Sequence, residues 1–340
     1  MQQATIGKNK EKLAIFKYSN LRNSAVFEKS GLALMMIIVA ILLTILTHGL
    51  YLSGRNIINI FVQSSMSGMV AVGMTFVILT AGIDLSVAGN ATLCAISASM
   101  ILRQVAPDNF IMWLLVIIGV ILLGGLVGLI NGMAVTVLKM VPFVTTLALL
   151  NITRGTAKTI SNAQTIQIVN NYHSVFGMAK IGGVLPVSVI MLLVVATIGF
   201  ILLNKTRFGR EIYAVGGNEK AAWLAGINTK RVIATAYVIS GICASLAGVL
   251  ITSQLMGCNS QIGTNMELDA IAACVIGGTS LMGGEGGLVG TIMGAIVIAM
   301  INIGLNLTGV SPFAQEIAKG GVIFSVVALD AVRRTNAKKD

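Results

Sequence analysis

The sequence predicts an all-α polytopic membrane protein, a helical bundle of about ten transmembrane helices. Its mean hydropathy is +0.90, and 56% of its residues are hydrophobic while 10% are charged. A typical soluble domain carries about a quarter charged residues, so this composition excludes an ordinary soluble globule. Apolar runs close to the roughly 20 residues that a helix needs to cross a bilayer recur along nearly the whole chain. The 38 glycines favour close approach between neighbouring helices.

The expected spans follow one another with short polar turns between them. Gly31 to Leu52 is too long for the apolar core of a cleaved signal peptide, so we expect it to be retained as the first helix. Regions 80–103 and 262–290 are expected to contain broken or half-length helices. The ten spans are predicted at 31–52, 57–80, 84–102, 112–136, 142–160, 184–204, 231–256, 267–282, 286–307 and 313–332.

Basic residues concentrate in three segments. Six of the 23 Lys and Arg lie before residue 30, six lie in 205–231 and four follow Val332. With ten spans these segments fall on one side, which the positive-inside rule makes the cytoplasm. Nucleic-acid binding is not indicated, because no aromatic platform is interleaved with the basic residues. The predicted parts are a basic cytoplasmic segment 1–30, a first transmembrane half 31–204, a cytoplasmic loop 205–231, a second transmembrane half 232–332 and a basic cytoplasmic tail 333–340.

Two glycine-rich stretches share one pattern. GGLVGLING in the fourth span and GGLVGTIMG in the ninth both read Gly-Gly-Leu-Val-Gly-x-Ile-x-Gly. A chance match stays possible, since glycine-rich helices resemble each other easily. A true repeat would pair segments 2–5 with 7–10 in opposite orientations, an arrangement typical of transport folds. The residues expected to pack against neighbouring helices are Gly124, Gly128, Gly132, Gly286, Gly290 and Gly294.

Polar side chains within the spans have two interpretations. Asp84 is costly in or near a membrane unless it finds partners or water. It is expected to cap the next helix together with Ser86, or to line a path for a solute. Hydroxyls after Pro142 either bond a neighbouring helix or offer weak hydrogen bonds to a polar, uncharged solute. The residues predicted to line a translocation path are Asp84, Ser86, Asn90, Phe143, Thr145, Thr146 and Asn151.

Catalytic and metal sites are not indicated. Cys94, Cys243, Cys258 and Cys274 show no paired spacing, and His48 and His173 stand without an acid or Cys at ligand spacing. Glu267 and Asp269 have no such companion either, and they fall at i,i+2, which does not share a helix face. Helix capping and interfacial positioning are the expected roles of these two acids. Glu316 and Lys319, three residues apart, are expected to pair on one helix face.

The polar segment 205–231 is expected to contain one short helix. Asn218 can cap it, Glu219 would lie in the first turn, and the helix would run to Ala225 and end near Gly226. The small residues Ala221, Ala222 and Ala225, with Leu224, predict a surface suited to a partner's groove. A solvated basic loop is the alternative. Residues 161–183 form the longest polar segment on the other side, where a partner can also dock.

Several motifs in order resemble the permease subunits of bacterial ABC importers for monosaccharides of the ribose, galactose and xylose type. The resemblance covers nearly all of residues 30–335. Its motifs are Gly82-Ile83-Asp84-Leu85-Ser86, Pro142-Phe143-Val144-Thr145-Thr146-Leu147, Thr206-Arg207-Phe208-Gly209 with Gly216-Gly217-Asn218-Glu219, and Glu267-Leu268-Asp269-Ala270-Ile271-Ala272 with Gly277-Gly278.

The resemblance implies that segment 205–231 is the loop that couples the permease to an ATPase. The family pattern Glu-Ala-Ala-x-x-x-Gly is matched by Lys220-Ala221-Ala222 and Gly226, so Lys220 departs from the expected acid. Ala88 also stands where the family often has Gly, and Gly89 follows it. The residues implied in ATPase coupling are Gly216, Gly217, Asn218, Glu219, Lys220, Ala221, Ala222, Leu224 and Gly226.

No Gly-x-x-x-x-Gly-Lys-Ser/Thr phosphate loop occurs, so no cofactor is expected in this chain and ATP with Mg would belong to a partner. The implied partners are an ATP-binding-cassette ATPase subunit, a periplasmic sugar-binding protein, a second permease subunit of the same or a related kind, and membrane lipid. The implied location is the bacterial inner membrane, with both termini cytoplasmic. The alternatives are a permease for a nucleoside or another small solute, such as a branched-chain amino acid, and an ion-coupled secondary carrier. An intramembrane enzyme ranks last.

Overall fold

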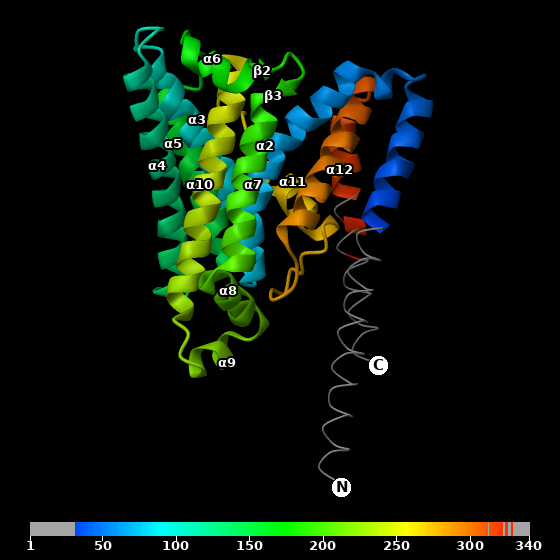
Figure 1. The fold of residues 1–340 in the computed structure, drawn as a ribbon. Coiled ribbons are helices and arrows are strands. Elements are labelled where there is room, and N and C mark those ends of the chain that lie inside the picture. Colours follow the sequence, from blue (N-terminus) through cyan, green and yellow to red (C-terminus); the bar gives the residue numbers. More distant parts are fainter. Residues whose placement is uncertain (1–30, 312, 322–323, 326–327, 329–340) are drawn as a thin grey trace.

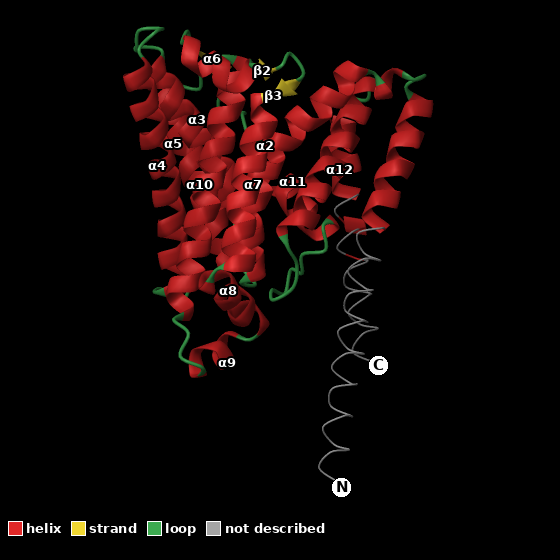
Figure 2. Ribbon diagram, viewed as in Figure 1, coloured by secondary structure: helices red, strands yellow, loops and turns green. Residues whose placement is uncertain are grey.

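The computed structural model describes residues 31–311, 313–321, 324–325 and 328. The described chain is an elongated bundle of helices with four very short strands (Figure 2). It begins with the helix Gly31–Leu46 and the 3-10 turn η1, Leu50–Leu52. The remaining helices of the bundle are α2 Gly54–Leu79, α3 Ser86–Leu102, α4 Phe110–Thr136, α5 Pro142–Ser161, α7 Val187–Lys205, α10 Thr229–Leu255, α11 Met266–Ile276 and α12 Leu288–Leu307. A further helical stretch covers 313–321.

The predicted spans correspond to these helices. In the described part of the chain, five helices are long and apolar enough to cross a membrane, namely α2, α4, α7, α10 and α12. The helix Gly31–Leu46 and α3 are apolar but shorter. The all-α polytopic fold is therefore confirmed. Residues beyond 321 in the last predicted span lie mostly outside the described residues, as do the basic segments 1–30 and 333–340.

One span differs from its prediction. The expected helix 267–282 ends at Ile276 as α11, a half-length helix, and residues 277–287 form an irregular connection to α12. Gly278, Gly283 and Gly284 in this connection have positive φ values, which suits glycine and ends helical structure. Gly286 was predicted to pack within a helix, but it precedes α12 with φ 133° and lies against Thr279, so that assignment was wrong.

The core of the bundle lies around α2 and α10. Most of α2 from Met69 to Leu79 is fully buried, and α10 packs against α2, α3 and α4. Figure 1 shows α10 running between α4 and α7, with α2 behind them. At Gly73 of α2 an added Cβ would lie 2.8 Å from the Ser240 Cα, so a side chain there would separate α2 from α10.

The two glycine-rich stretches contact different partners. Gly124, Gly128 and Gly132 of α4 lie against the backbone of α10. Gly290 and Gly294 of α12 lie against the backbone of α11. These five glycines thus lie at close helix contacts, as the packing interpretation expects. The helix pairs also correspond between the halves, because α4 packs on α10 as α12 packs on α2, and α3 contacts α10 as α11 contacts α2.

The bundle has two different ends (Figure 1). One end carries α6, Asn171–Met178, and the strand pairs β1 Ile166–Gln167 with β4 Gly257–Cys258 and β2 Lys180–Ile181 with β3 Leu185–Pro186. The opposite end carries α8, Arg207–Gly217, and α9, Glu219–Leu224. The segments 161–183 and 205–231 therefore lie on opposite sides, as their positions in the span order predict.

Candidate functional site

Helix α8 is fixed to the bundle and was not predicted. Thr206 caps it by accepting a hydrogen bond from the Gly209 amide at 3.3 Å, and Ile212 and Val215 are buried on one face. At Gly216 an added Cβ would lie 1.8 Å from the Leu79 carbonyl oxygen, so the helix touches the end of α2. The Tyr213 hydroxyl donates to the Gly286 carbonyl at 2.9 Å, and burial raises the pKa of Tyr213. The spacing of buried Ile212 and Val215, three residues apart, was the available sequence signal.

Helix α9 has the predicted caps. The Asn218 side chain accepts from the Ala221 amide at 2.9 Å, and the helix ends one residue earlier than expected. Gly226 has φ +85°, its amide donates to the Trp223 carbonyl, and the Ile227 amide donates to the Ala222 carbonyl. This pair of bonds is the Schellman pattern that terminates helices at glycine.

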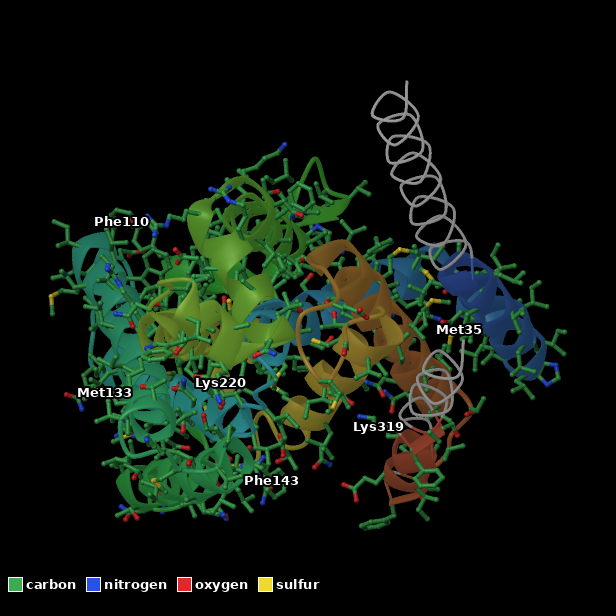
Figure 3. The ribbon with its side chains drawn as sticks, turned by 90° about the horizontal axis from the view of Figure 1, so that it is seen from below. Met35, Phe110, Met133, Phe143, Lys220 and Lys319 are labelled. Carbon is green, nitrogen blue, oxygen red and sulfur yellow. The ribbon has the colours of Figure 1, made fainter. Side chains whose placement is uncertain are left out.

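The exposed surface of α9 differs from the prediction at one residue. Ala222, expected in a docking surface, is 5% exposed and packs inward with the core. Trp223 and Leu224, by contrast, are 65% and 71% exposed. A six-residue helix has only one face toward the bundle, and Ala222 occupies that face. Gly217, Glu219, Lys220 and Ala221 are exposed as well (Figure 3 labels Lys220).

Asp84 lies at the centre of a buried hydrogen-bond network. Its Oδ1 accepts from the Ser86 amide at 3.0 Å and the Ser86 hydroxyl at 2.6 Å, and from the Asn131 amide group at 3.4 Å. Its Oδ2 accepts from the Ser240 hydroxyl at 2.8 Å. The carboxylate therefore joins the start of α3 to α4 and α10. The bond from the Ser86 amide agrees with a structural role at the start of α3, where Leu85 is the N-cap residue, and a role of Asp84 in a path stays a prediction.

The other predicted path residues are divided between interior and surface. Asn90 is buried and donates to the carbonyls of Gly124 and Gly241, at 3.1 and 3.3 Å. Ser86, Thr145 and Thr146 are also buried, and Thr146 donates to the Ile83 carbonyl at 3.2 Å. Phe143 is 51% exposed, and Asn151 is exposed on the same helix. The structure thus does not gather these seven residues on one surface.

Two ion pairs lie at the start of α11. Arg154 Nη2 of α5 lies 3.7 Å from Glu267 Oε2, and Lys319 Nζ lies 3.4 Å from Asp269 Oδ2. The predicted pair of Glu316 with Lys319 was wrong, because Lys319 turns to Asp269 while Glu316 accepts from the Asn265 amide group at 3.4 Å. Sequence reasoning missed Arg154 and Lys319 as partners of the two acids, since contacts between residues at least 50 positions apart depend on packing.

The end with α6 is closed by polar and aromatic contacts. His173 is fully buried, with Nε2 3.1 Å from the Thr252 hydroxyl, and the Trp113 indole donates to its Nδ1 at 3.4 Å. Burial lowers the pKa of His173 to about 4. Beside this cluster, β1 and β4 border a cleft of about 460 Å³ that includes Gln167, Cys258 and Asn259. His173 is therefore a structural residue, as expected.

A family described as the permease component of the branched-chain amino acid transport system matches residues 56–327. The chain belongs to this permease family. The ribose import permease protein of Bacillus subtilis (strain 168) is 43% identical over 308 residues, which cover 90% of this chain and 93% of the relative.

Two Escherichia coli (strain K12) proteins extend the comparison. The D-allose transport system permease protein is 38% identical over 311 residues, covering 91% of this chain and 93% of the relative. The galactose/methyl galactoside import permease protein is 33% identical over 332 residues, covering 94% and 99%. No solved structure matches the chain. The resemblance stated from the motifs is confirmed.

Proposed function

We propose that this chain is the membrane-spanning subunit of an ATP-driven importer for a monosaccharide, a pentose or hexose. The observation that carries the proposal is α9, a capped helix that presents Trp223 and Leu224 at one end of an apolar bundle. Exposed large apolar side chains on a short polar-flanked helix are typical of a surface that enters a partner's groove. The importers named above, for ribose, allose and galactose, support a sugar as the solute.

The contacts of α8 connect the neighbouring helix α9 mechanically to the bundle. Gly216 lies against Leu79 at the end of α2, and the Gly284 amide donates to the Leu79 carbonyl at 3.0 Å. Tyr213 adds the hydrogen bond to Gly286 in the connection between α11 and α12. A displacement of α9 would therefore act on both halves of the bundle at once. Rigid-body rotation of packed helices then exposes the path alternately to each side.

The proposal includes partners and a location. A separate ATPase subunit would dock on α9 and bind ATP and Mg, a binding protein would deliver the sugar at the end with α6, and a second permease subunit would complete the bundle. The inner membrane is the proposed location, and the basic residues of segment 205–231 and of both ends support cytoplasmic termini. Lys220 in place of the family's acid leaves α9 with one exposed base beside the exposed acid Glu219, so an acidic partner for Lys220 is expected on the ATPase.

The test is uptake of D-ribose, D-allose and D-galactose into vesicles that hold this chain with its ATPase and binding protein. Wild-type uptake should require ATP, and Trp223→Asp should abolish it while the protein stays inserted. Trp223→Phe is the matched control, because it keeps an apolar ring and should keep most activity. ATP-driven uptake by Trp223→Asp at the wild-type rate would contradict docking through α9. Uptake driven by a proton or sodium gradient without the ATPase would favour the secondary carrier.

A further inference from the structure

A polar, non-helical segment connects β4 to α11. Residues 259–265 form turns, with Asn259, Gln261 and Thr264 exposed, and α11 then begins with Met266. Figure 1 shows that α11 lies at mid-height of the bundle, below the end that carries α6. Irregular backbone at membrane depth is tolerated only where it is buried in protein or lines a water-filled cavity. The exposed amides and hydroxyl of this segment indicate the second case.

The Arg154–Glu267 pair lies next to this segment. Arg154 is about 18 Å along α5 from Pro142, at 1.5 Å per residue, and so lies just past the middle of the helix. Its Nη2 and the Glu267 Oε2 are 3.7 Å apart, and neither atom has a hydrogen-bond partner within the described residues. The Glu267 side chain is 9% exposed and that of Arg154 is 26% exposed. A buried carboxylate oxygen and a guanidinium nitrogen without hydrogen bonds are costly unless a further polar group joins them.

The neighbouring ion pair, Lys319 with Asp269, is a structural contact with which the Arg154–Glu267 pair can be compared. Lys319 donates to Asp269 at 3.4 Å, and both acids lie in the first turn of α11, where the helix dipole favours them. That pair holds the helical stretch 313–321 to α11. The Arg154–Glu267 pair instead joins α5, which packs on α3 and α4, to α11, which packs on α12 and α2. It therefore links α5 and α11, two helices that both contact α3 and otherwise pack on different neighbours.

We propose that Arg154 and Glu267 hold a hydroxyl of an uncharged, polyhydroxylated solute during its passage. The hydroxyl would donate to Glu267 Oε2 and accept from Arg154 Nη2, which satisfies both orphaned atoms without adding charge. Asn151, one turn earlier on α5, is exposed and three residues from Arg154, so it extends the same polar face. This assignment rests on the proposed function and moves the solute path away from Asp84.

The first experiment measures accessibility. The four native cysteines are buried and free, so a charged, membrane-impermeant methanethiosulfonate should label the wild type poorly. Glu267→Cys should be labelled at least about tenfold faster than Leu268→Cys, whose side chain is exposed on α11 and is expected to face lipid if Glu267 faces the path. D-Ribose-loaded binding protein with ATP should slow the labelling of Glu267→Cys. Equal labelling of the two variants, or labelling that ribose leaves unchanged, would overturn the proposal.

The second experiment measures transport with the complete importer. Glu267→Gln keeps the size of the side chain but removes its charge, and it should lower D-ribose uptake at least about tenfold at equal inserted protein. Asp269→Asn is the matched control and should change uptake less than threefold, because the pair it weakens joins 313–321 to α11 and is not part of the proposed solute contact. Wild-type uptake by Glu267→Gln would overturn the solute contact. Absence of ATP-driven uptake of any of the three sugars by the wild type would instead refute the proposed function.

Discussion

Asp84 and Glu267 are both buried carboxylates, but their surroundings differ. Asp84 accepts hydrogen bonds from Ser86, Asn131 and Ser240, all neutral donors. Glu267 faces one cation at 3.7 Å and leaves an oxygen without a hydrogen bond. A carboxylate whose acceptor positions are filled from three helices holds the fold together. A carboxylate with an unfilled position costs stability, and such groups are retained where they contact a ligand or the solvent.

The largest loss of folding stability is expected for Asp84→Leu. The change leaves the donors of Ser86 and Ser240 buried without an acceptor, at about 1–3 kcal/mol for each unsatisfied group, while Asn131 keeps its hydrogen bond to the Ser86 hydroxyl. We expect little folded protein after purification, measured as the monodisperse fraction in detergent. Asp84→Asn, which keeps the shape and one oxygen, should recover part of it. A folded Asp84→Leu protein with an unchanged melting temperature would remove the distinction between the two carboxylates.

His173 is a third buried titratable side chain, and both of its ring nitrogens have hydrogen-bond partners. The Thr252 hydroxyl donates to the Val249 carbonyl, so it accepts from Nε2–H of neutral His173, and Nδ1 accepts from Trp113. The folded pKa of about 4 lies below the ordinary 6.5. The unfolded chain therefore takes up the proton first, and stability is complete above pH 6.5 and falls as the pH drops toward 4.

Protonation linked to His173 is expected to lower the free energy of unfolding by about 3 kcal/mol at pH 4 relative to pH 7. Melting temperatures across this range should fall more steeply for the wild type than for His173→Gln, which does not titrate. Identical slopes for the two proteins would show that protonation of His173 does not limit stability at this end of the bundle.

Asn90→Leu removes a buried amide group that makes two hydrogen bonds, so a smaller loss of stability is expected. The Asn90 amide group donates to the carbonyls of Gly124 and Gly241 and so joins α3 to α4 and α10. Each of these bonds contributes about 1 kcal/mol, and both carbonyls keep their own helical bonds. A loss of about 2 kcal/mol in the free energy of unfolding is expected. Gly119→Ala on α4, where an added Cβ meets nothing within 4 Å, is the control that should not destabilise.

The smallest effect on stability is expected for Glu267→Gln. Removing the charge costs the attraction to a partly exposed Arg154 but relieves an unfilled, buried oxygen, so the two terms nearly cancel. The melting temperature should stay within about 2 °C of the wild type, a shift below 1 kcal/mol for a chain of this size. A large fall in melting temperature would place Glu267 with Asp84 among the structural carboxylates.

The local features of this protein were determined by its sequence. Hydropathy located the helices, since spanning length and apolarity are properties of single segments. Asn218 and Gly226 defined the limits of α9 to within one residue, because capping bonds reach only a few residues along the chain. The half-length helix after Met266 was also anticipated, although its end at Ile276 was not.

Only the tertiary structure decided which polar groups meet. Ser240 reaches Asp84 across 156 residues, and Lys319 selects Asp269 over its neighbour Glu316. The choice of Ala222 as the inward residue of α9, with Trp223 exposed, likewise depends on the bundle against which it packs. Such contacts depend on how separate helices approach each other, and that information is spread over every residue of the interface. One segment read by itself does not contain it.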